Sequence, residues 1–292
     1  MSVALSAYFY QKKRIISFFR VEYFGMTDEF LGNLGKYRPA QTRAGDWTLY
    51  SEFFDEHCHS LEGSVQETET VYIQGTELKS QAEYARREHR PLFILEVGFG
   101  AGVGASRAWN FAQTIPEQEV QFYSLELDAE LVRYVVTTAP FTQTFSAFKE
   151  TRSDNQWSFS LQNFHLHILI GDARHSVRQL KESRKVKFDA FFHDPFGPQK
   201  NPTLWTVEIF RNLMALTYPH SVLSTYSAAI GIRKAMMEAQ WVVEDRPGFG
   251  IKKSSTRARP SGTMDTALVQ KLERSPIMAL HEHPDLLDGK IK

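Results

Sequence analysis

Cysteine is almost absent from this sequence of 292 residues. The single cysteine, Cys58, excludes an internal disulfide and any zinc site built from several cysteines. Net charge is absent too, since 34 basic residues balance 34 acidic ones, so a contact with nucleic acid must come from a local patch. We therefore expect a cytoplasmic protein without a metal ion.

Long apolar runs are also missing. No segment is long and apolar enough to span a membrane, and we expect no membrane partner. Residues 9–20 mix basic and aromatic side chains, a pattern that also fits an amphipathic helix on a membrane surface. The preferred interpretation is an N-terminal extension that does not follow the pattern of the rest of the chain. A secretory signal is not expected, because the uncharged stretches are short.

Apolar strand-like runs alternate with helical patterns across residues 92–245. This alternation predicts an α/β fold with a mostly parallel sheet and helices on both faces. A further β-rich run is expected at residues 71–73, and residues 139–160 are interpreted as a loop or short helices. Seven sheet strands are expected, at residues 92–97, 120–126, 164–170, 186–193, 221–226, 241–245 and 264–269.

The chain divides into four parts in this interpretation. Residues 1–45 form an N-terminal extension that is expected to be partly disordered, and residues 46–90 form a small β-rich segment. Residues 91–272 form the main α/β domain, and residues 273–292 form a polar tail.

Ligands of parallel sheets bind beyond the carboxyl ends of the strands, so the first strand end is informative. It carries Glu96 and then Gly98, Gly100 and Gly102. Glycines at alternate positions allow a tight turn and a close approach of the backbone to a ligand. Nicotinamide enzymes use similar turns, and a turn that binds nothing is another alternative. The GxGxG spacing with a preceding acid resembles methyltransferase motif I, which lies against the methionine part of S-adenosylmethionine.

Acidic residues also end the next two strands. Glu126 is placed to accept both hydroxyls of a ribose, while Asp128 is expected to cap the following helix. Asp172 is placed to face an adenine amino group or to cap a helix, and the two roles can coexist.

The fourth strand ends at Asp194, followed by a loop with three prolines and a glycine. Such a loop is stiff and non-helical. A carboxylate that emerges beside a bound donor is well placed to act on a methyl acceptor. The alternative is a structural turn that Asp194 caps.

Six segments together resemble the methyltransferase half of the bifunctional MnmC family, and more closely its stand-alone relatives. The similarity covers about residues 46–253, and the run after the fourth strand, residues 192–206, is its most specific part. The segments occur in the order 46–51, 63–68, 71–75, 96–102, 192–206 and 248–253.

The resemblance implies a Rossmann-like class I methyltransferase with a seven-stranded, mostly parallel sheet. The expected reaction is transfer of a methyl group from S-adenosyl-L-methionine to the 5-aminomethyl group of (2-thio)uridine at the tRNA wobble position. The tRNA anticodon loop would be the substrate. A separate oxidase, or the wobble-uridine modification enzymes upstream, would be further partners. We expect no FAD, because this chain ends too early for the flavin-dependent oxidase half.

Site roles also follow from the resemblance, position by position. Asp194 would be catalytic, facing the donor methyl group and the acceptor amine. The substrate side would include Phe196, Lys200, Trp205, Lys252 and Lys253. The donor side would include Glu96, Gly98, Gly100, Gly102, Glu126 and Asp172, with Tyr50 and Glu67 closing its pocket.

Two of the substrate assignments have alternatives. Phe196 and Trp205 are candidates to stack on a base from a single-stranded loop, but Trp205 could equally be a packed core residue. Residues 246–259 contain five basic residues and no acid, which suits phosphate contacts or simply a solvated loop.

Two other functions stay open. An aminopropyltransferase of the spermidine synthase type shares the sheet and a similar loop after the fourth strand, but its first turn should contain three adjacent glycines and a following acid. A donor-binding module without catalysis is the non-enzymatic alternative.

Overall fold

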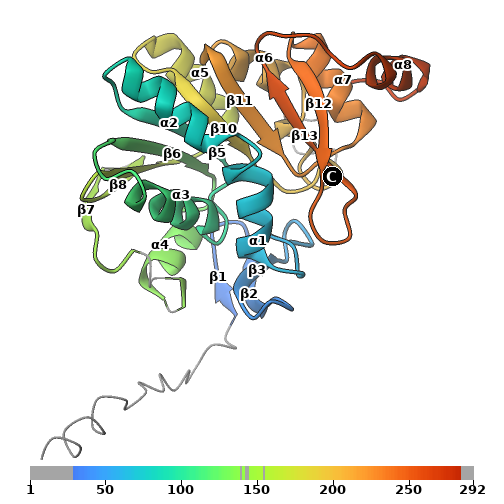
Figure 1. Cartoon of the computed structure of the whole chain (residues 1–292). Coiled ribbons are helices and arrows are strands. Elements are labelled where there is room, and N and C mark those ends of the chain that lie inside the picture. Colours follow the sequence, from blue (N-terminus) through green and yellow to red (C-terminus); the bar gives the residue numbers. More distant parts are fainter. Residues whose placement is uncertain (1–28, 139, 142–144, 154, 284–292) are drawn as a thin grey trace, which may run out of the picture.

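The computed structural model describes residues 29–138, 140–141, 145–153 and 155–283. It contains two sheets, and the smaller one lies at the lower end of the molecule in the view of Figure 1. The basic and aromatic residues 9–20 of the sequence lie outside the described part of the chain.

The small sheet is antiparallel and formed by the N-terminal part of the chain. Its strands are β1 (Phe30–Leu31), β2 (Lys36–Gln41), β3 (Trp47–Ser51) and β4 (Glu56–His57). It therefore begins inside the segment that we predicted to be an extension. Three helical elements follow it, α1 (Ser64–Thr68), η1 (Glu69–Ile73) and α2 (Leu78–Arg87).

The predicted strand at residues 71–73 is wrong. These residues belong to η1, a single π-helical turn. Val71 and Tyr72 are buried in it, so their apolar character reflects core packing instead of sheet pairing. Short apolar runs do not distinguish strands from buried helical turns.

The predicted α/β fold with helices on both faces is confirmed, but the sheet is mixed instead of mostly parallel, with four parallel and four antiparallel strand pairings in the described part of the chain. The large sheet has the order β12-β13-β11-β10-β5-β6-β9-β8-β7. Its central strands are parallel, and those at both edges are antiparallel. The parallel strands are β5 (Leu92–Val97), β6 (Val120–Glu126), β9 (Phe164–Ile170), β10 (Phe188–His193) and β11 (Thr217–Thr225). The antiparallel strands are β7 (Lys149–Arg152), β8 (Gln156–Leu161), β12 (Val242–Pro247) and β13 (Ser254–Arg259).

Two details of the predicted sheet were wrong. The last strand is β13, whereas the predicted residues 264–269 lead into helix α8 (Thr266–Arg274), capped by Asp265. The sequence of β13 is polar because its arginines form ion pairs with Glu77 and Glu244. The hairpin of β7 and β8 extends the sheet beyond the predicted seven strands, in a region interpreted as a loop or short helices.

Helices cover the two faces of the large sheet and enclose two cores (Figure 1). Buried residues of α2, α3 (Val103–Gln113) and α4 (Ala129–Thr137) pack in one core. Those of α5 (Ala173–Ser183), α6 (Val207–Met214), α7 (Ile230–Glu238) and α8 pack in the other. The strands supply aromatic and branched side chains to both, as expected for a sheet buried on both faces.

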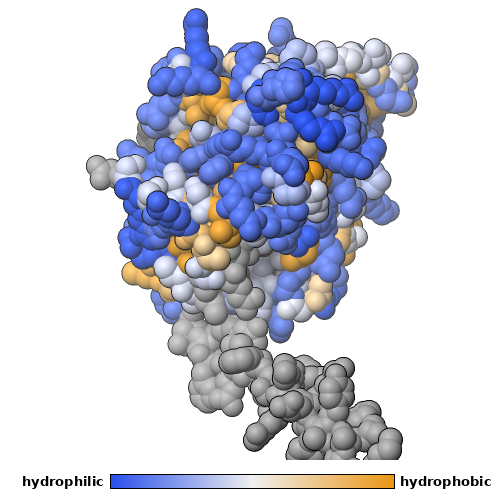
Figure 2. Space-filling model, turned by 60° about the vertical axis from the view of Figure 1, so that its left-hand side comes forward, coloured by the Kyte–Doolittle hydropathy of each residue, from blue (hydrophilic) through white to orange (hydrophobic). Residues whose placement is uncertain are grey.

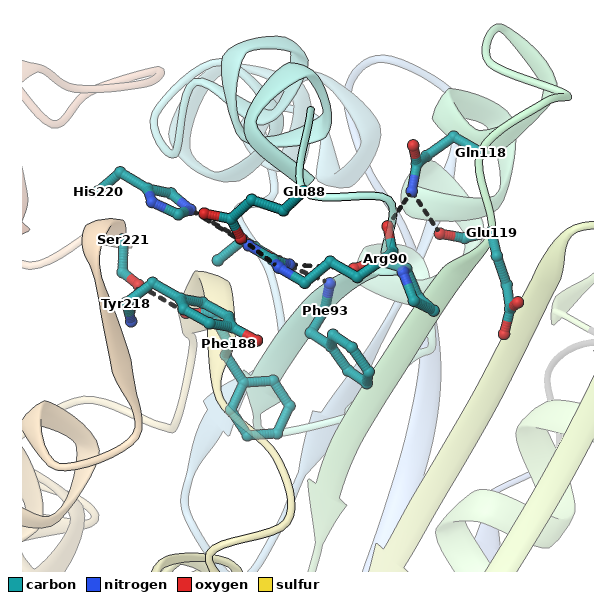
Figure 3. Close-up of polar contacts among 11 residues, drawn as sticks. Glu88, Arg90, Phe93, Gln118, Glu119, Phe188, Tyr218, His220 and Ser221 are labelled. Atoms are coloured by element: carbon teal, nitrogen blue, oxygen red, sulfur yellow. Dashed lines mark hydrogen bonds and ion pairs between the residues drawn. The ribbon is translucent and has the colours of Figure 1, made fainter. Parts of the chain in front are cut away.

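The amino end of β10 carries a buried acid, Asp189, whose partners Arg90, Phe93 and His220 are labelled in Figure 3. Arg90 donates two hydrogen bonds to its carboxylate, at 2.7 and 2.9 Å. The backbone N–H of Phe93 and the His220 ring each lie 2.9 Å from the same carboxylate. This network connects β10 to β5, β11 and the loop after α2.

The segment that follows α8 packs against α6 and α7. Val207 donates its backbone N–H to the Leu280 carbonyl at 2.9 Å, and the Lys234 ammonium donates to the Ser275 carbonyl at 2.8 Å. Within the described ranges, no helix has the length and apolar character to cross a bilayer. The face in Figure 2 is mainly hydrophilic, with small separated apolar patches.

Candidate active site

The site lies where the strand order reverses, between β5 and β10. From β5 the chain proceeds outward to β6 and β9, whereas β10 and β11 lie on the other side. Ligands bind at such switch points, beyond the carboxyl ends of the strands. Two loops meet here, since Asp194 donates its backbone N–H to the Val97 carbonyl at 3.0 Å. A Cβ on Gly98 (φ +98°) would lie 2.6 Å from the Asp194 carbonyl oxygen, so only glycine fits.

The glycine turn is connected to the end of β6. Gly100 (φ +51°) donates its N–H to Glu126 Oε2 at 3.2 Å. Gly102 (φ +73°) is the N-cap of α3. Burial raises the pKa of Glu126, although three backbone N–H groups oppose the shift. The glycine turn and Glu126 thus form one wall of the site, on the side where the sequence predicts a ribose.

Glu96 supports this wall from beneath. It is 2 % exposed and accepts a 2.5 Å hydrogen bond from the Ser124 hydroxyl. A Cβ on Gly104 would clash with its carboxylate, so a fourth glycine, which the sequence interpretation missed, lets the acid lie under α3. Burial raises the pKa of Glu96, and the charges of Asp194 and Glu126 add to the effect. Glu96 and Gly102 lie behind the two cavities described below, instead of lining them.

Four of the eight predicted donor residues line the first cavity. Asp172 caps α5 by accepting the Arg174 N–H at 2.8 Å, and its Oδ2 accepts from Arg174 Nη2 at 2.6 Å. Burial acts to raise the pKa of Asp172, but hydrogen bonds from Arg174 outweigh it and the pKa is lowered. Its charged form is therefore favoured. The lining includes Gly98, Gly100, Glu126, Gly171, Asp172 and Asp194.

A second cavity, of about 350 Å³, adjoins the first one. Asp194, Pro195 and Phe196 line both cavities, and so do Cys58 and His59. Asp194 is partly exposed, and it lies at their junction. Burial raises the pKa of Asp194 strongly, and the Glu67 carboxylate adds to this, with the Tyr72 hydroxyl acting in the opposite direction. A donor in one cavity and an acceptor in the other would meet at this acid.

The loop after β10 is held by hydrogen bonds to its backbone. Trp205 Nε1 and the Tyr226 hydroxyl donate to the carbonyls of Phe196 and Pro195, each at 2.9 Å. Glu56 Oε2 accepts the Gly197 N–H at 2.7 Å. Trp205 is completely buried, so the base-stacking prediction is corrected in favour of the core alternative. Phe196 stays at the cavities, stacked on Phe54 with ring centroids 4.2 Å apart.

Three other predicted residues take unexpected places. The Tyr50 hydroxyl donates to Asp55 Oδ1 at 2.6 Å, and Lys200 Nζ lies 2.7 Å from Asp55 Oδ2. Tyr50 and Lys200 are thus joined through Asp55, and neither lines the two cavities. Glu67 lines the second cavity instead of the predicted donor pocket, because α1 presents it beside Lys252.

The predicted basic stretch divides into two parts. Arg257 and Arg259 form ion pairs with Glu77 and Glu244, so they contribute no free positive charge to the surface. Lys252 lines the second cavity, and Lys253 is exposed beside it. Within the described residues, the predicted basic surface is therefore retained by the turn between β12 and β13 together with the exposed Arg246 of β12.

Several cavity residues were missed by the sequence interpretation. Tyr226 follows β11, and the strand-end rule that selected Glu126 would have found it. The others lie in turns or, for Arg174, in the first turn of α5, where no spacing distinguishes them. They are Phe54, Cys58, His59, Arg174 and Phe249.

Comparisons with known proteins agree with this geometry. Residues 138–261 match the model of a family described as S-adenosyl-L-methionine-dependent methyltransferase. The chain is an S-adenosylmethionine-dependent methyltransferase. The structure of this methyltransferase is similar to that of MnmC2 from Aquifex aeolicus, with 23% identity, a TM-score of 0.66, and 86% and 79% of the two chains covered. Its fold is that of the MnmC-type methyltransferase domain.

Two further similarities are weaker. A probable spermidine synthase from Corynebacterium glutamicum has 16% identity and a TM-score of 0.46, with 88% of this chain and 96% of that chain covered. The O-methyltransferase TomG from Streptomyces achromogenes, solved with the methyl donor, has 14% identity and a TM-score of 0.37, with 63% and 89% covered.

The first cavity fits the methyl donor. Gly98 and Gly100 leave the turn without side chains at the cavity wall, and a Cβ on Gly171 would project into open space. Two carboxylates, Glu126 and Asp172, are available as acceptors for ribose hydroxyls and an adenine amino group. No group of three or more histidine, cysteine, aspartate or glutamate side chains in the described ranges is placed to hold a metal ion.

Proposed function

We propose that this methyltransferase methylates the primary amine of a 5-aminomethyluridine, with or without 2-thiolation, at the wobble position of tRNA. The product would be 5-methylaminomethyl(-2-thio)uridine. The observation that supports this most is the position of Asp194 at the junction of two cavities. One cavity fits the donor, and the other is open to a second reactant and has basic residues at its rim.

The second cavity supports an RNA base as the acceptor. A base in a single-stranded loop can leave its stack and enter a protein pocket. Phe196 offers an aromatic ring at the junction, and Phe54 supports that ring from behind. Lys253 and Arg43 lie at the rim or next to it, where phosphates of the same strand can be held.

Positioning is the main task of the protein in this reaction. When bound, S-adenosylmethionine supplies an electrophilic methyl group that needs no further activation. Gly98, Gly100, Glu126 and Asp172 would hold the donor, and the backbone contacts of Trp205 and Tyr226 fix the loop that carries Asp194. Well-oriented reactants react as if present at effective concentrations of about 10⁵ M or more.

Asp194 has the chemical role in this mechanism. The acceptor arrives as an ammonium ion, and the Asp194 carboxylate takes one proton from it. The nitrogen lone pair then forms the new N–C bond while the C–S bond breaks and its electron pair goes to sulfur. The raised pKa of Asp194 brings its proton affinity closer to that of an amine, which favours this transfer.

The proposal is tested with tRNA from a strain that lacks this activity. Incubation with labelled S-adenosylmethionine, followed by nucleoside mass spectrometry, should show one methyl group added to 5-aminomethyl(-2-thio)uridine. Fully modified tRNA is the control and should take up no label.

Two results would replace the proposal by its alternatives. Transfer to putrescine from decarboxylated S-adenosylmethionine, with no label in tRNA, would indicate an aminopropyltransferase. Tight binding of S-adenosylmethionine without turnover on undermodified tRNA would indicate a donor-binding module.

A further inference from the structure

A lysine side chain of the protein itself, that of Lys252, lines the second cavity, which is the proposed acceptor site. Lys252 comes from the turn between β12 and β13, and its Nζ lies 3.9 Å from the centroid of the Tyr226 ring. The same ammonium is 3.9 Å from Glu67 Oε1. The side chain is 45% exposed, so its stem reaches in from solvent.

Glu67 is built into the wall of this cavity. It is 5 % exposed, and its Oε2 accepts the Ser60 backbone N–H at 2.7 Å. Its other oxygen, Oε1, is the one directed at the lysine. Asp194 lies in the same cavity, close enough for the two carboxylates to influence each other. A buried carboxylate without a cation is costly, which explains the attraction of a lysine to this position.

A carboxylate beside the face of an aromatic ring is a typical recognition site for an alkylammonium ion. The acceptor of the proposed reaction carries such an ion on a single methylene. We propose that Glu67 and the Tyr226 ring form a cation site for the aminomethyl group of the substrate, next to Asp194, and that Lys252 occupies this site until the substrate displaces it. The inference rests on the proposed function, because it assigns the amine-binding part of that same site.

The arrangement has a consequence for each residue. Glu67 binds the substrate cation and is not needed to hold the donor, since it lies outside the first cavity. Lys252 competes with the substrate amine, although once displaced it is free to contact phosphate. Removing Lys252 should therefore strengthen recognition of the amine while weakening general contact with RNA.

Binding of two anticodon stem-loops separates these effects. One carries 5-aminomethyluridine at the wobble position, and the other carries the neutral, similarly sized 5-hydroxymethyluridine. Dissociation constants are measured for the full chain in the presence of S-adenosylhomocysteine, which prevents turnover. Phosphate contacts contribute equally to both stem-loops, so the ratio of the two constants reports the cation site alone.

We expect the wild-type protein to prefer the aminomethyl stem-loop by about tenfold, which corresponds to about 1.4 kcal/mol. Glu67→Gln keeps an oxygen for the Ser60 N–H and should reduce the preference to about twofold or less. Lys252→Met should increase the preference severalfold above that of the wild type. Lys187→Met is a matched control, because Lys187 Nζ lies 5.9 Å from another tyrosine ring, that of Tyr218, at the opposite end of the sheet.

An unchanged preference in Glu67→Gln, with S-adenosylhomocysteine affinity retained, would overturn the cation site. A reduced preference in Lys252→Met would overturn the competition. The proposed function fails in a different way, namely when the wild-type protein neither methylates the aminomethyl stem-loop nor prefers it.

Discussion

Strand β10 has an acid at each end, and the two acids have opposite surroundings. Asp189, at the amino end, is completely buried and is held by Arg90, His220 and the Phe93 N–H (Figure 3). Asp194, just beyond the carboxyl end, forms no ion pair in the described part of the chain and faces two cavities. Burial raises the pKa of Asp194.

This difference distinguishes an acid that stabilises the fold from an acid that is available for chemistry. A buried carboxylate that is fully hydrogen-bonded to a cation is inert, and removing it leaves an unpaired partner. A carboxylate with few partners and a shifted pKa costs stability, and it is a common feature of catalytic sites. We therefore expect substitutions at the two ends of β10 to affect different measurable quantities.

The largest effect is expected for Asp194→Asn. Removing the proton acceptor should lower turnover by about 10²- to 10⁴-fold, while S-adenosylhomocysteine binds within a few-fold of wild type. Single-turnover methylation and calorimetric binding measure the two quantities. Asp172→Asn is the control with the reverse pattern, a loss of donor affinity that exceeds any loss in the chemical step. Normal turnover in Asp194→Asn would remove its catalytic role.

At the other end of the strand, Asp189→Asn should lower the free energy of unfolding by about 3–5 kcal/mol, because the Arg90 charge loses its partner. Turnover per folded molecule should stay unchanged. Urea denaturation and an activity titration check both points. Glu88→Gln, which removes the exposed partner of the same arginine, should cost less than about 1 kcal/mol. Equal losses in the two variants would show that the network is no more important than a surface ion pair.

Trp205→Phe tests whether the loop after β10 must be held in place. The variant loses the hydrogen bond from Nε1 to the Phe196 carbonyl, so stability should fall by about 1 kcal/mol and turnover by about tenfold. Trp241→Phe is the matched control, since Trp241 Nε1 donates to the Phe210 carbonyl at the same 2.9 Å, away from the cavities. It should lose similar stability and no turnover. Equal turnover losses would contradict a positioning role for Trp205.

The smallest effect is a pH dependence at Glu96. Because burial raises its pKa above the ordinary 4.5, the folded state keeps the proton more tightly than the unfolded state. This stabilisation is complete below the unfolded pKa and is lost as the pH rises through the folded pKa. Glu96→Gln cannot lose that stabilisation, so relative to wild type it should become more stable as the pH rises from about 4 to about 8.

Urea denaturation at several pH values measures this difference. Ser124→Ala removes a hydroxyl that lowers the pKa of Glu96 but leaves the acid, so its pH dependence should be at least as large as that of the wild type. A constant difference between Glu96→Gln and wild type would show that Glu96 has the same pKa in the folded and unfolded states, which would contradict the raised pKa.

Periodicity in the sequence determined most of the fold. Uninterrupted apolar runs identified the five parallel strands, and the strand-end rule located Gly98, Glu126, Asp172 and Asp194. Strands with polar sequences could not be identified in this way. Strand β13 has a buried arginine, Arg257, whose partners are Glu77, 180 residues away in the sequence, and Glu244 on the paired strand β12. The β7–β8 hairpin extends an edge that needs no continuous apolar run.

By itself, the sequence indicated the methyl donor and selected the acid at the end of the fourth predicted strand, because a glycine turn and a strand end are local features whose spacing is visible in the chain. Only the tertiary structure decided what surrounds them. It placed Glu67 at the second cavity instead of the first, buried Trp205 beneath the loop, and brought Lys252 and Tyr226 to the same cavity. Such juxtapositions depend on contacts between segments far apart in the chain, and no local pattern records them.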